Sequence, residues 1–116
     1  LASYIFYGAR NLESVSLPDN TVSIGNNAFY NCTSLKELVL PASVTEIGSK
    51  AFYKCTGLTK LVIPASVTYI GNQAFYRWQT TQTICVSFAE NAVPDTFDYR
   101  WLRYCDATVV YSYTGE

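Results

Sequence analysis

Residues 35–57 read LKELVLPASVTEIGSKAFYKCTG, and residues 58–80 read LTKLVIPASVTYIGNQAFYRWQT. The two stretches are identical at thirteen of 23 positions, without a gap. Residues 12–34 form an earlier copy, which shares ten positions with the next one. Residues 1–11 align with the end of a still earlier copy. Self-similarity at a fixed period of about 20–50 residues predicts a solenoid of stacked coils.

Each copy predicts two short extended segments. In the second full copy, residues 38–40 alternate between core-facing and outward side chains, as their equivalents 15–17 and 61–63 do. Pro41 ends this strand, because proline cannot donate to a ladder. A second extended segment, residues 44–47, is closed by a glycine, which indicates a positive φ or a close backbone approach.

The last part of each copy predicts one or two helical turns. Residues 49–55 would place Ala51, Phe52 and Cys55 on the inner side. A single coil cannot bury its own apolar face, whereas coils stacked about 4.7–4.9 Å apart share continuous sheets and a continuous core. The predicted inward columns are Leu12/Leu35/Leu58, Val15/Leu38/Leu61/Ile84, Leu17/Leu40/Ile63/Val86, Ile24/Ile47/Ile70 and Phe6/Phe29/Phe52/Phe75. The pair Thr21 and Val22 reverses the Val-Thr order of later copies and predicts a local register adjustment.

The repeat fades after residue 87, where a gapless count places Asp98 in the Phe75 position. An open solenoid end exposes strand edges and core, so a cap is expected. Trp78, Phe97, Trp101, Leu102 and Tyr104 are its expected lids, and residues 107–111 a closing strand. We therefore predict a single domain at 1–111, with a partial repeat (1–11), three full repeats (12–34, 35–57, 58–80), a cap (81–111) and a tail (112–116). Because the chain begins inside a repeat, we expect further coils upstream.

Composition excludes several classes of function. A net charge of −1 gives no electrostatic case for nucleic acid, and no run approaches the roughly 18–20 apolar residues needed for membrane insertion. The chain has no histidine, so Ser-His and Cys-His catalysis and ordinary zinc sites are absent. No Gly-rich phosphate loop or calcium loop is present. We predict no enzyme activity, no catalytic residues, no metal and no cofactor.

The four cysteines fit no compact disulfide framework. Cys32 and Cys55 share one repeat position and are expected to be small buried apolar groups. Cys85 and Cys105 could pair if the C-terminal segment folds back, which geometry decides and sequence does not.

The unit LxxLxLPxSVTxIGxxAFxxCxx, nearly intact at residues 35–57, resembles the BspA-type leucine-rich repeat. The likeness covers residues 1–80 well, and the C-terminal segment more loosely resembles the closing element of such proteins from gut Gram-positive bacteria. The resemblance implies a curved right-handed, β-rich solenoid of parallel coils in secreted or surface-anchored proteins of bacteria and some protozoan parasites. It also implies an extracellular or cell-surface location and adhesion to host proteins, other bacteria or extracellular matrix. It brings no shared catalytic residues.

Two surfaces are candidates for binding. Tyr7, Tyr30, Tyr53 and Tyr76 follow the core phenylalanines and form either a ladder of aromatic anchors or a packing layer over the seam between coils. The outward side of the main strands carries Glu37, Val39, Lys60 and Val62, beside Ser14, Ser16, Thr83 and Cys85. That side is either a weakly apolar binding stripe or an ordinary solvated face.

The favoured function is a non-catalytic protein-interaction or adhesion module of a secreted or surface bacterial protein. A structural spacer without its own ligand is the alternative, and a carbohydrate-binding module using the tyrosines is a further one. Exposed contiguous tyrosines favour binding of protein or glycan, whereas tyrosines packed down on a polar surface favour the spacer.

Overall fold

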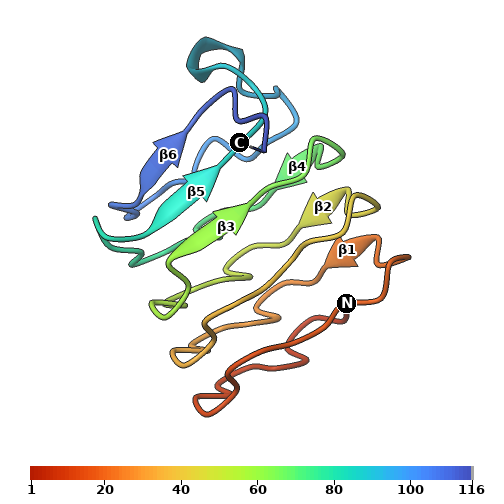
Figure 1. Cartoon of the computed structure of the whole chain (residues 1–116), viewed down its shortest axis with the longest axis vertical. Helices are drawn as coiled ribbons and strands as arrows, with labels where there is room; N and C mark the ends of the chain where they lie inside the picture. The colour runs from red at the N-terminus through yellow and green to blue at the C-terminus, as the bar shows by residue number, and fades with distance from the viewer. Residues whose placement is uncertain (116) are drawn as a thin grey trace.

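The computed structural model describes residues 1–115, which form a stack of parallel coils that rises from the N-terminal to the C-terminal end (Figure 1). Strands β1 (Ser23–Ile24), β2 (Glu46–Ile47) and β4 (Tyr69–Ile70) form one parallel sheet. Strands β3 (Lys60–Val62), β5 (Thr83–Cys85) and β6 (Thr108–Val110) form the other. The one helix among these residues is a short 3-10 turn, η1 (Glu90–Ala92). The predicted repeat solenoid is confirmed.

Strand register follows the repeat. Ile24 pairs with Ile47, which pairs with Ile70, so the ladder advances by one repeat at each coil. On the other sheet, Leu61 pairs with Ile84. The predicted strands at 15–17 and 38–40 are wrong as regular strands, because their ladder is reduced to one bridge between Ser14 and Glu37. Regular pairing on this side begins only with β3.

The reversed pair of the first full copy does not shift the register. Thr21 points inward in place of the later valines, while Val22 is 58% exposed. The Thr21 hydroxyl donates a 2.7 Å hydrogen bond to the Pro18 carbonyl, so the inward polar group is satisfied. Ser23 still pairs with Glu46. The expected register adjustment is therefore wrong.

The predicted helical turns are also wrong, because residues 49–55 form successive β-turns. The N–H groups of Ala51, Tyr53 and Cys55 donate to the carbonyl three residues back. The intervening N–H groups, those of Lys50, Phe52 and Lys54, donate instead to carbonyls of the next coil at 2.8–3.1 Å. Lys50 and Lys54 lie in the left-handed region, both with φ 56°. A helix would use every N–H within its own coil and leave the neighbouring coil unpaired.

The glycine that closes the second extended segment is required by a close approach. A Cβ on Gly48 would lie 2.6 Å from the backbone nitrogen of Asn26 and 2.8 Å from the carbonyl carbon of Gly25 in the preceding coil. Its φ is not positive. Of the two explanations offered by the sequence, the close approach is the correct one.

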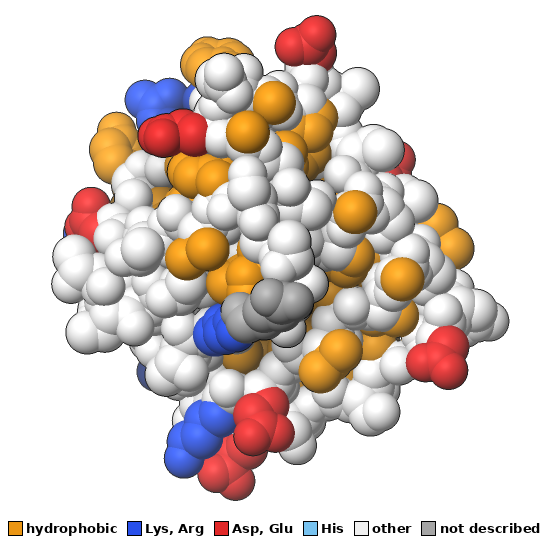
Figure 2. Space-filling view, turned by 45° about the horizontal axis from the view of Figure 1, so that its top comes forward, with side chains coloured by type: hydrophobic (Ala, Val, Ile, Leu, Met, Phe, Trp, Pro, Cys, Tyr) orange, Lys and Arg blue, Asp and Glu red, His pale blue; other side chains and the backbone are white. Residues whose placement is uncertain are grey.

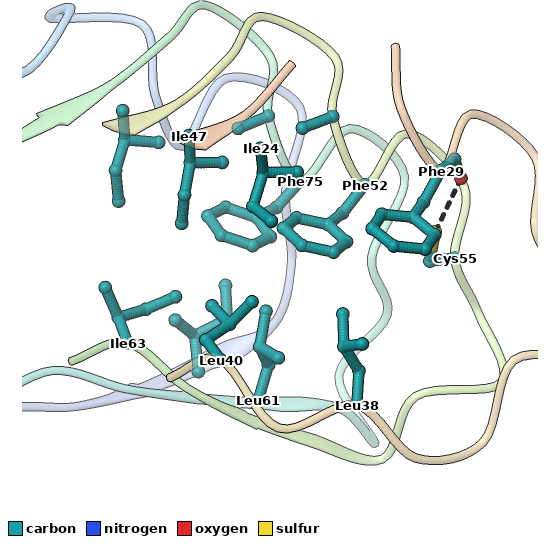
Figure 3. Packing of buried hydrophobic residues seen from close by; sticks show 14 of the residues in the cluster. Ile24, Phe29, Leu38, Leu40, Ile47, Phe52, Cys55, Leu61, Ile63 and Phe75 are labelled. Atoms are coloured by element: carbon teal, nitrogen blue, oxygen red, sulfur yellow. Dashed lines mark hydrogen bonds between the residues drawn. The ribbon is translucent and has the colours of Figure 1, made fainter. Parts of the chain in front are cut away.

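All five predicted columns lie in the core. Figure 3 shows isoleucine and phenylalanine side chains meeting leucine and isoleucine side chains from the opposite wall. The phenylalanine rings stack with centroids 5.4–5.7 Å apart. Phe6 is half-buried, whereas Phe29, Phe52 and Phe75 are fully buried, since Phe6 has a ring on one side only.

The last coil is longer than the others. The Cys105 N–H donates to the Leu102 carbonyl as the Trp78 N–H donates to that of Phe75. Leu102 therefore takes the Phe75 position, 27 residues later, which is four more than the 23-residue period. The gapless assignment of Asp98 to that position is wrong, because it ignores this insertion.

The expected lids are mostly buried. Trp78, Phe97 and Trp101 are at most 7% exposed, and Leu102 is half-buried against the core. Tyr104 is 62% exposed, so its assignment as a lid is wrong. The predicted closing strand is present as β6, which pairs with β5 in parallel.

Candidate functional site

The tyrosine column forms one stack of rings, which we call the tyrosine ladder (Tyr7, Tyr30, Tyr53, Tyr76). Each tyrosine follows a core phenylalanine on the turn, so it lies on the opposite side of the backbone. Successive ring centroids are 4.5, 4.2 and 4.3 Å apart, with planes inclined by 14°, 9° and 8°. The faces of neighbouring rings therefore cover one another and are not available to a partner.

The ladder keeps its edges open to solvent. Tyr7 is 52% exposed, and the other three rings are half-buried. Two cations lie beside it: Lys54 Nζ is 5.7 Å from the centre of the Tyr53 ring, and the Arg77 guanidinium is 5.4 Å from that of Tyr76. The rings therefore pack on the seam between coils, as the second alternative predicts. The first alternative, a ladder of aromatic anchors, stays a prediction.

Neighbouring hydroxyls and cations set the ionisation of the ladder in opposite directions. Burial, and then the hydroxyls of Tyr30 and Tyr76, raise the pKa of Tyr53 to about 12. A hydrogen bond with Arg77 lowers the pKa of Tyr76 despite some desolvation. The Arg77 cation therefore makes tyrosinate easier to form at Tyr76 than at Tyr53.

A cleft of about 790 Å³ lies at the C-terminal end of the tyrosine ladder. Tyr104 meets Tyr76 edge-on, with centroids 5.6 Å apart and planes at 86°. Thr33, Lys54, Thr56 and Arg77 also line the cleft. Its size is within the roughly 300–1,000 Å³ typical of ligand sites.

The second predicted surface, the strand face, is partly covered. Exposure falls along its apolar row from 81% at Val39 to 40% at Val62 and 2% at Cys85. Lys60 on β3 donates a 3.1 Å hydrogen bond to the hydroxyl of Tyr113, which follows β6. Since β5 lies between those strands, Tyr113 crosses over it. Hydrophobic side chains in the view of Figure 2 form several separate groups rather than one large patch.

The remaining residue predicted for the strand face, Glu37, lies at its less regular end. It is exposed and makes the single bridge to Ser14. A shallow hollow of about 400 Å³ includes both residues together with Val39. The structure thus places Glu37 and Val39 on one side of the strand face and the Lys60–Tyr113 contact on the other.

The cysteine column has a role that sequence reasoning missed. The thiols of Cys32 and Cys55 donate to the carbonyls of Phe6 and Phe29, at 3.2 and 2.9 Å. Figure 3 shows the bond from Cys55 to Phe29. In the next coil, the indole N–H of Trp78 donates to the Phe52 carbonyl at 2.8 Å. The signal in the sequence was the exchange of cysteine for tryptophan, two residue types that share a side-chain donor and little else.

All four cysteines are free thiols, so the open question of a Cys85–Cys105 bridge is answered in the negative. Burial raises the pKa of each thiol, which disfavours the reactive thiolate. Residues 1–115 contain no group of three metal-ligating side chains that could hold an ion. No helix in that range has the length and apolar character that crossing a membrane requires.

With this geometry in view, relatives can be identified. Residues 1–104 match the family described as the BspA type leucine rich repeat region, in six copies. The chain belongs to this family. Leucine-rich repeat proteins of this family are generally non-catalytic interaction modules. No curated protein matches the chain.

Solved structures agree with the family assignment. The chain is similar to a leucine-rich repeat protein of T. pallidum, at 29% identity and a TM-score of 0.70, over 96% of this chain and 44% of that one. It is also similar to a leucine-rich cell surface protein of Faecalibacterium prausnitzii A2-165, at 38% identity and a TM-score of 0.68, over 73% and 22%. A leucine-rich repeat protein of Bacteroides ovatus shares the fold at 21% identity and a TM-score of 0.65, over 92% and 38%. The chain therefore spans less than half the length of each.

Proposed function

We propose that this chain is an adhesion module that binds protein partners at a bacterial cell surface or outside the cell, through the tyrosine ladder. The observation that carries the proposal is the stack of rings 4.2–4.5 Å apart with open edges. Family membership supports a repeat interaction module, and the F. prausnitzii relative, described as a cell surface protein, supports the location.

The ladder suits binding because its rings are ordered before any partner arrives. Binding ordinarily orders flexible side chains at a cost of about 0.5–1.5 kcal/mol each, which a pre-stacked ring largely avoids. Tyrosine adds a hydroxyl at the edge of its contact area and is enriched at the centres of protein interfaces. The strand face offers less apolar surface to a partner, since the exposure of its apolar row falls from Val39 to Cys85.

The test is surface plasmon resonance with the protein immobilised, over purified extracellular-matrix proteins and mucin. Tyr30→Phe/Tyr53→Phe/Tyr76→Phe keeps the ring stack and removes the hydroxyls, whereas the corresponding serine triple variant removes both. The matched control is Val39→Ser/Val62→Ser on the strand face. We expect binding that weakens in the phenylalanine variant, is lost in the serine variant and is unchanged in the control.

Other outcomes would replace the proposal. Loss of binding in the strand-face control alone would move the interface to that face. Absence of binding to every matrix protein and mucin would favour the spacer, in which the stacked rings serve only to hold the coils together. Circular dichroism of each variant separates loss of binding from loss of folding.

A further inference from the structure

Two cations that form no ion pair within the described residues line the cleft at the C-terminal end of the tyrosine ladder. Among residues 1–115, neither Lys54 nor Arg77 forms an ion pair. Both are exposed, line the cleft and occupy equivalent positions of adjacent coils. Like charges on neighbouring coils repel each other, and Asp106, the one carboxylate of the described lining, forms no ion pair with either cation there.

The backbone conformation at Lys54 and Arg77 favours residue types other than lysine and arginine. Lys54 has φ 56° and Arg77 has φ 68°, in the left-handed region where glycine and asparagine are favoured. Asn31, in the preceding coil, holds the same position with φ 60°. Gly8 and Asn31 hold this position in the two preceding coils, so the left-handed backbone does not itself require a cation.

Other lining groups indicate what kind of anion would fit. Thr33, Thr56 and Gln79 present hydroxyl and amide groups, and Tyr76 and Tyr104 present amphipathic rings. Aliphatic side chains, which would seat the apolar anchors of a peptide, are absent from the described lining. Asp106 is the one carboxylate there, so two cations and one anion leave the cleft with a net charge of +1.

We propose that this cleft binds an acidic saccharide, a sugar whose carboxylate or sulfate pairs with Lys54 and Arg77. The sugar hydroxyls meet Thr33, Thr56 and Gln79, and its ring contacts Tyr76 and Tyr104. This inference goes beyond protein binding by the tyrosine ladder and does not depend on it.

Isothermal titration calorimetry and ligand-observed NMR with defined probes test this. The probes are 3′-sialyllactose, a sulfated heparin disaccharide, neutral lactose and a glutamate-rich peptide. We expect at least one acidic saccharide to bind, and lactose to bind about tenfold or more weakly. Binding should also weaken as salt rises.

Charge variants locate the site. Lys54→Gln and Arg77→Gln should each weaken binding about tenfold, and Asp106→Asn should tighten it. Glutamine is compatible with this backbone, since Gln73 has φ 58° at another left-handed position. Lys50→Gln is the matched control: it removes the same charge at φ 56° outside the cleft and should leave binding unchanged.

Four results would overturn the inference: lactose binding as tightly as the acidic sugars, the peptide binding as tightly as they do, equal effects of Lys50→Gln and Lys54→Gln, or no binding of either acidic sugar at millimolar concentration. Thermal melts of the variants establish that they fold. The saccharide test uses isolated sugars and the variants of Lys54 and Arg77, which keep all four rings of the tyrosine ladder, so the failure of saccharide binding and the failure of protein binding by the ladder are separately visible.

Discussion

The thiol of Cys55 is a second donor to the Phe29 carbonyl, which also accepts from the Cys32 N–H at 3.1 Å. Its Sγ donates at 2.9 Å to Phe29, deep in the core. Because the carbonyl keeps its backbone bond, loss of the thiol removes the net contribution of one hydrogen bond, about 0.5–1.5 kcal/mol, together with the packing of the sulfur. We therefore expect Cys55→Ala to lower the free energy of unfolding by at least that amount, measured by urea denaturation, and Cys55→Ser, which keeps a donor, to lower it less.

Cys85→Ala is the matched control for this prediction. Cys85 is buried, at 2% exposure, yet it makes no side-chain hydrogen bond within residues 1–115. The difference between Cys55→Ala and Cys85→Ala then reports mainly the lost hydrogen bond. Equal losses in Cys55→Ser and Cys55→Ala would show that the thiol acts through its size alone.

The raised pKa of Tyr53 predicts a loss of stability in alkali. The folded-state pKa of about 12 exceeds the ordinary value of 10, because burial and the neighbouring hydroxyls disfavour tyrosinate. The stabilising contribution is therefore fully present below pH 10 and is lost as the pH rises through about 12. Denaturant unfolding across this range should show a steeper decline for the natural protein than for Tyr53→Phe.

Tyr99→Phe controls for general alkaline effects, since Tyr99 is 86% exposed and lies outside the tyrosine ladder. Its profile should follow that of the natural protein. A Tyr53→Phe variant whose stability declines just as steeply would mean that Tyr53 ionises in the folded ladder as easily as in the unfolded chain.

The sequence predicted which side chains point into the core, but not which hydrogen bonds or ring contacts they make. The inward direction of Phe52 followed from the period, because stacked copies have to bury the same positions. The donor role of Cys55 did not follow, since cysteine is more often a small buried apolar group. The ring stacking of Tyr53 depends on a turn geometry that the pattern of apolar residues does not report.

At the level of elements, Gln82 links the last turn to the start of β5. Its Nε2 donates to the carbonyls of Cys55 and Leu58 at 2.9 and 2.8 Å, and its Oε1 accepts from the Gln79 N–H at 2.8 Å. The side chain is buried, at 2% exposure, with both amide atoms in hydrogen bonds. It thus completes the turn that leads into the second sheet.

Gln82→Leu should destabilise the protein by at least about 2 kcal/mol, because it leaves the buried Leu58 carbonyl and the Gln79 N–H without partners and removes one of the two donors to the Cys55 carbonyl. The measurement is the midpoint of urea unfolding, with Gln79→Leu as control, since the Gln79 side chain is exposed and makes no hydrogen bond in the described structure. Gln82→Glu is similar in shape but cannot donate, so it should also be destabilising. A stable Gln82→Leu would mean that the turn forms without the amide.

The second extended segment of each copy was predicted well, whereas the first extended segment and the turns were predicted poorly. β1, β2 and β4 pair in register with the period, so the second extended segment was found. The turns of residues 49–55 carry inward residues at a spacing that also suits a helix, and only the alternation of donors between coils distinguishes the two. The four-residue insertion in the last coil hid the equivalence of Leu102 and Phe75, because the gapless comparison placed Asp98 in that position.

On the scale of the whole molecule, each coil is stabilised by its neighbours, so the position of a residue in the stack should decide its energetic weight. Phe52 lies between Phe29 and Phe75, with ring centroids 5.4 and 5.7 Å away. Phe6 stacks only on Phe29, at 5.5 Å, and is half-buried. Phe52→Ala should therefore lower the free energy of unfolding by about 3–5 kcal/mol, and Phe6→Ala by less than half as much.

Urea unfolding of the two variants, followed by circular dichroism and by tryptophan fluorescence, checks this expectation. Trp78 and Trp101 are both buried beside Phe75 at the C-terminal end, so fluorescence reports on that end of the stack. In Phe6→Ala the dichroism signal should be lost before the fluorescence signal, because the first coil loosens while the last coils hold. Coincident transitions and equal losses in both variants would mean that the stack unfolds as one unit, with its stability shared by all coils rather than passed between neighbours.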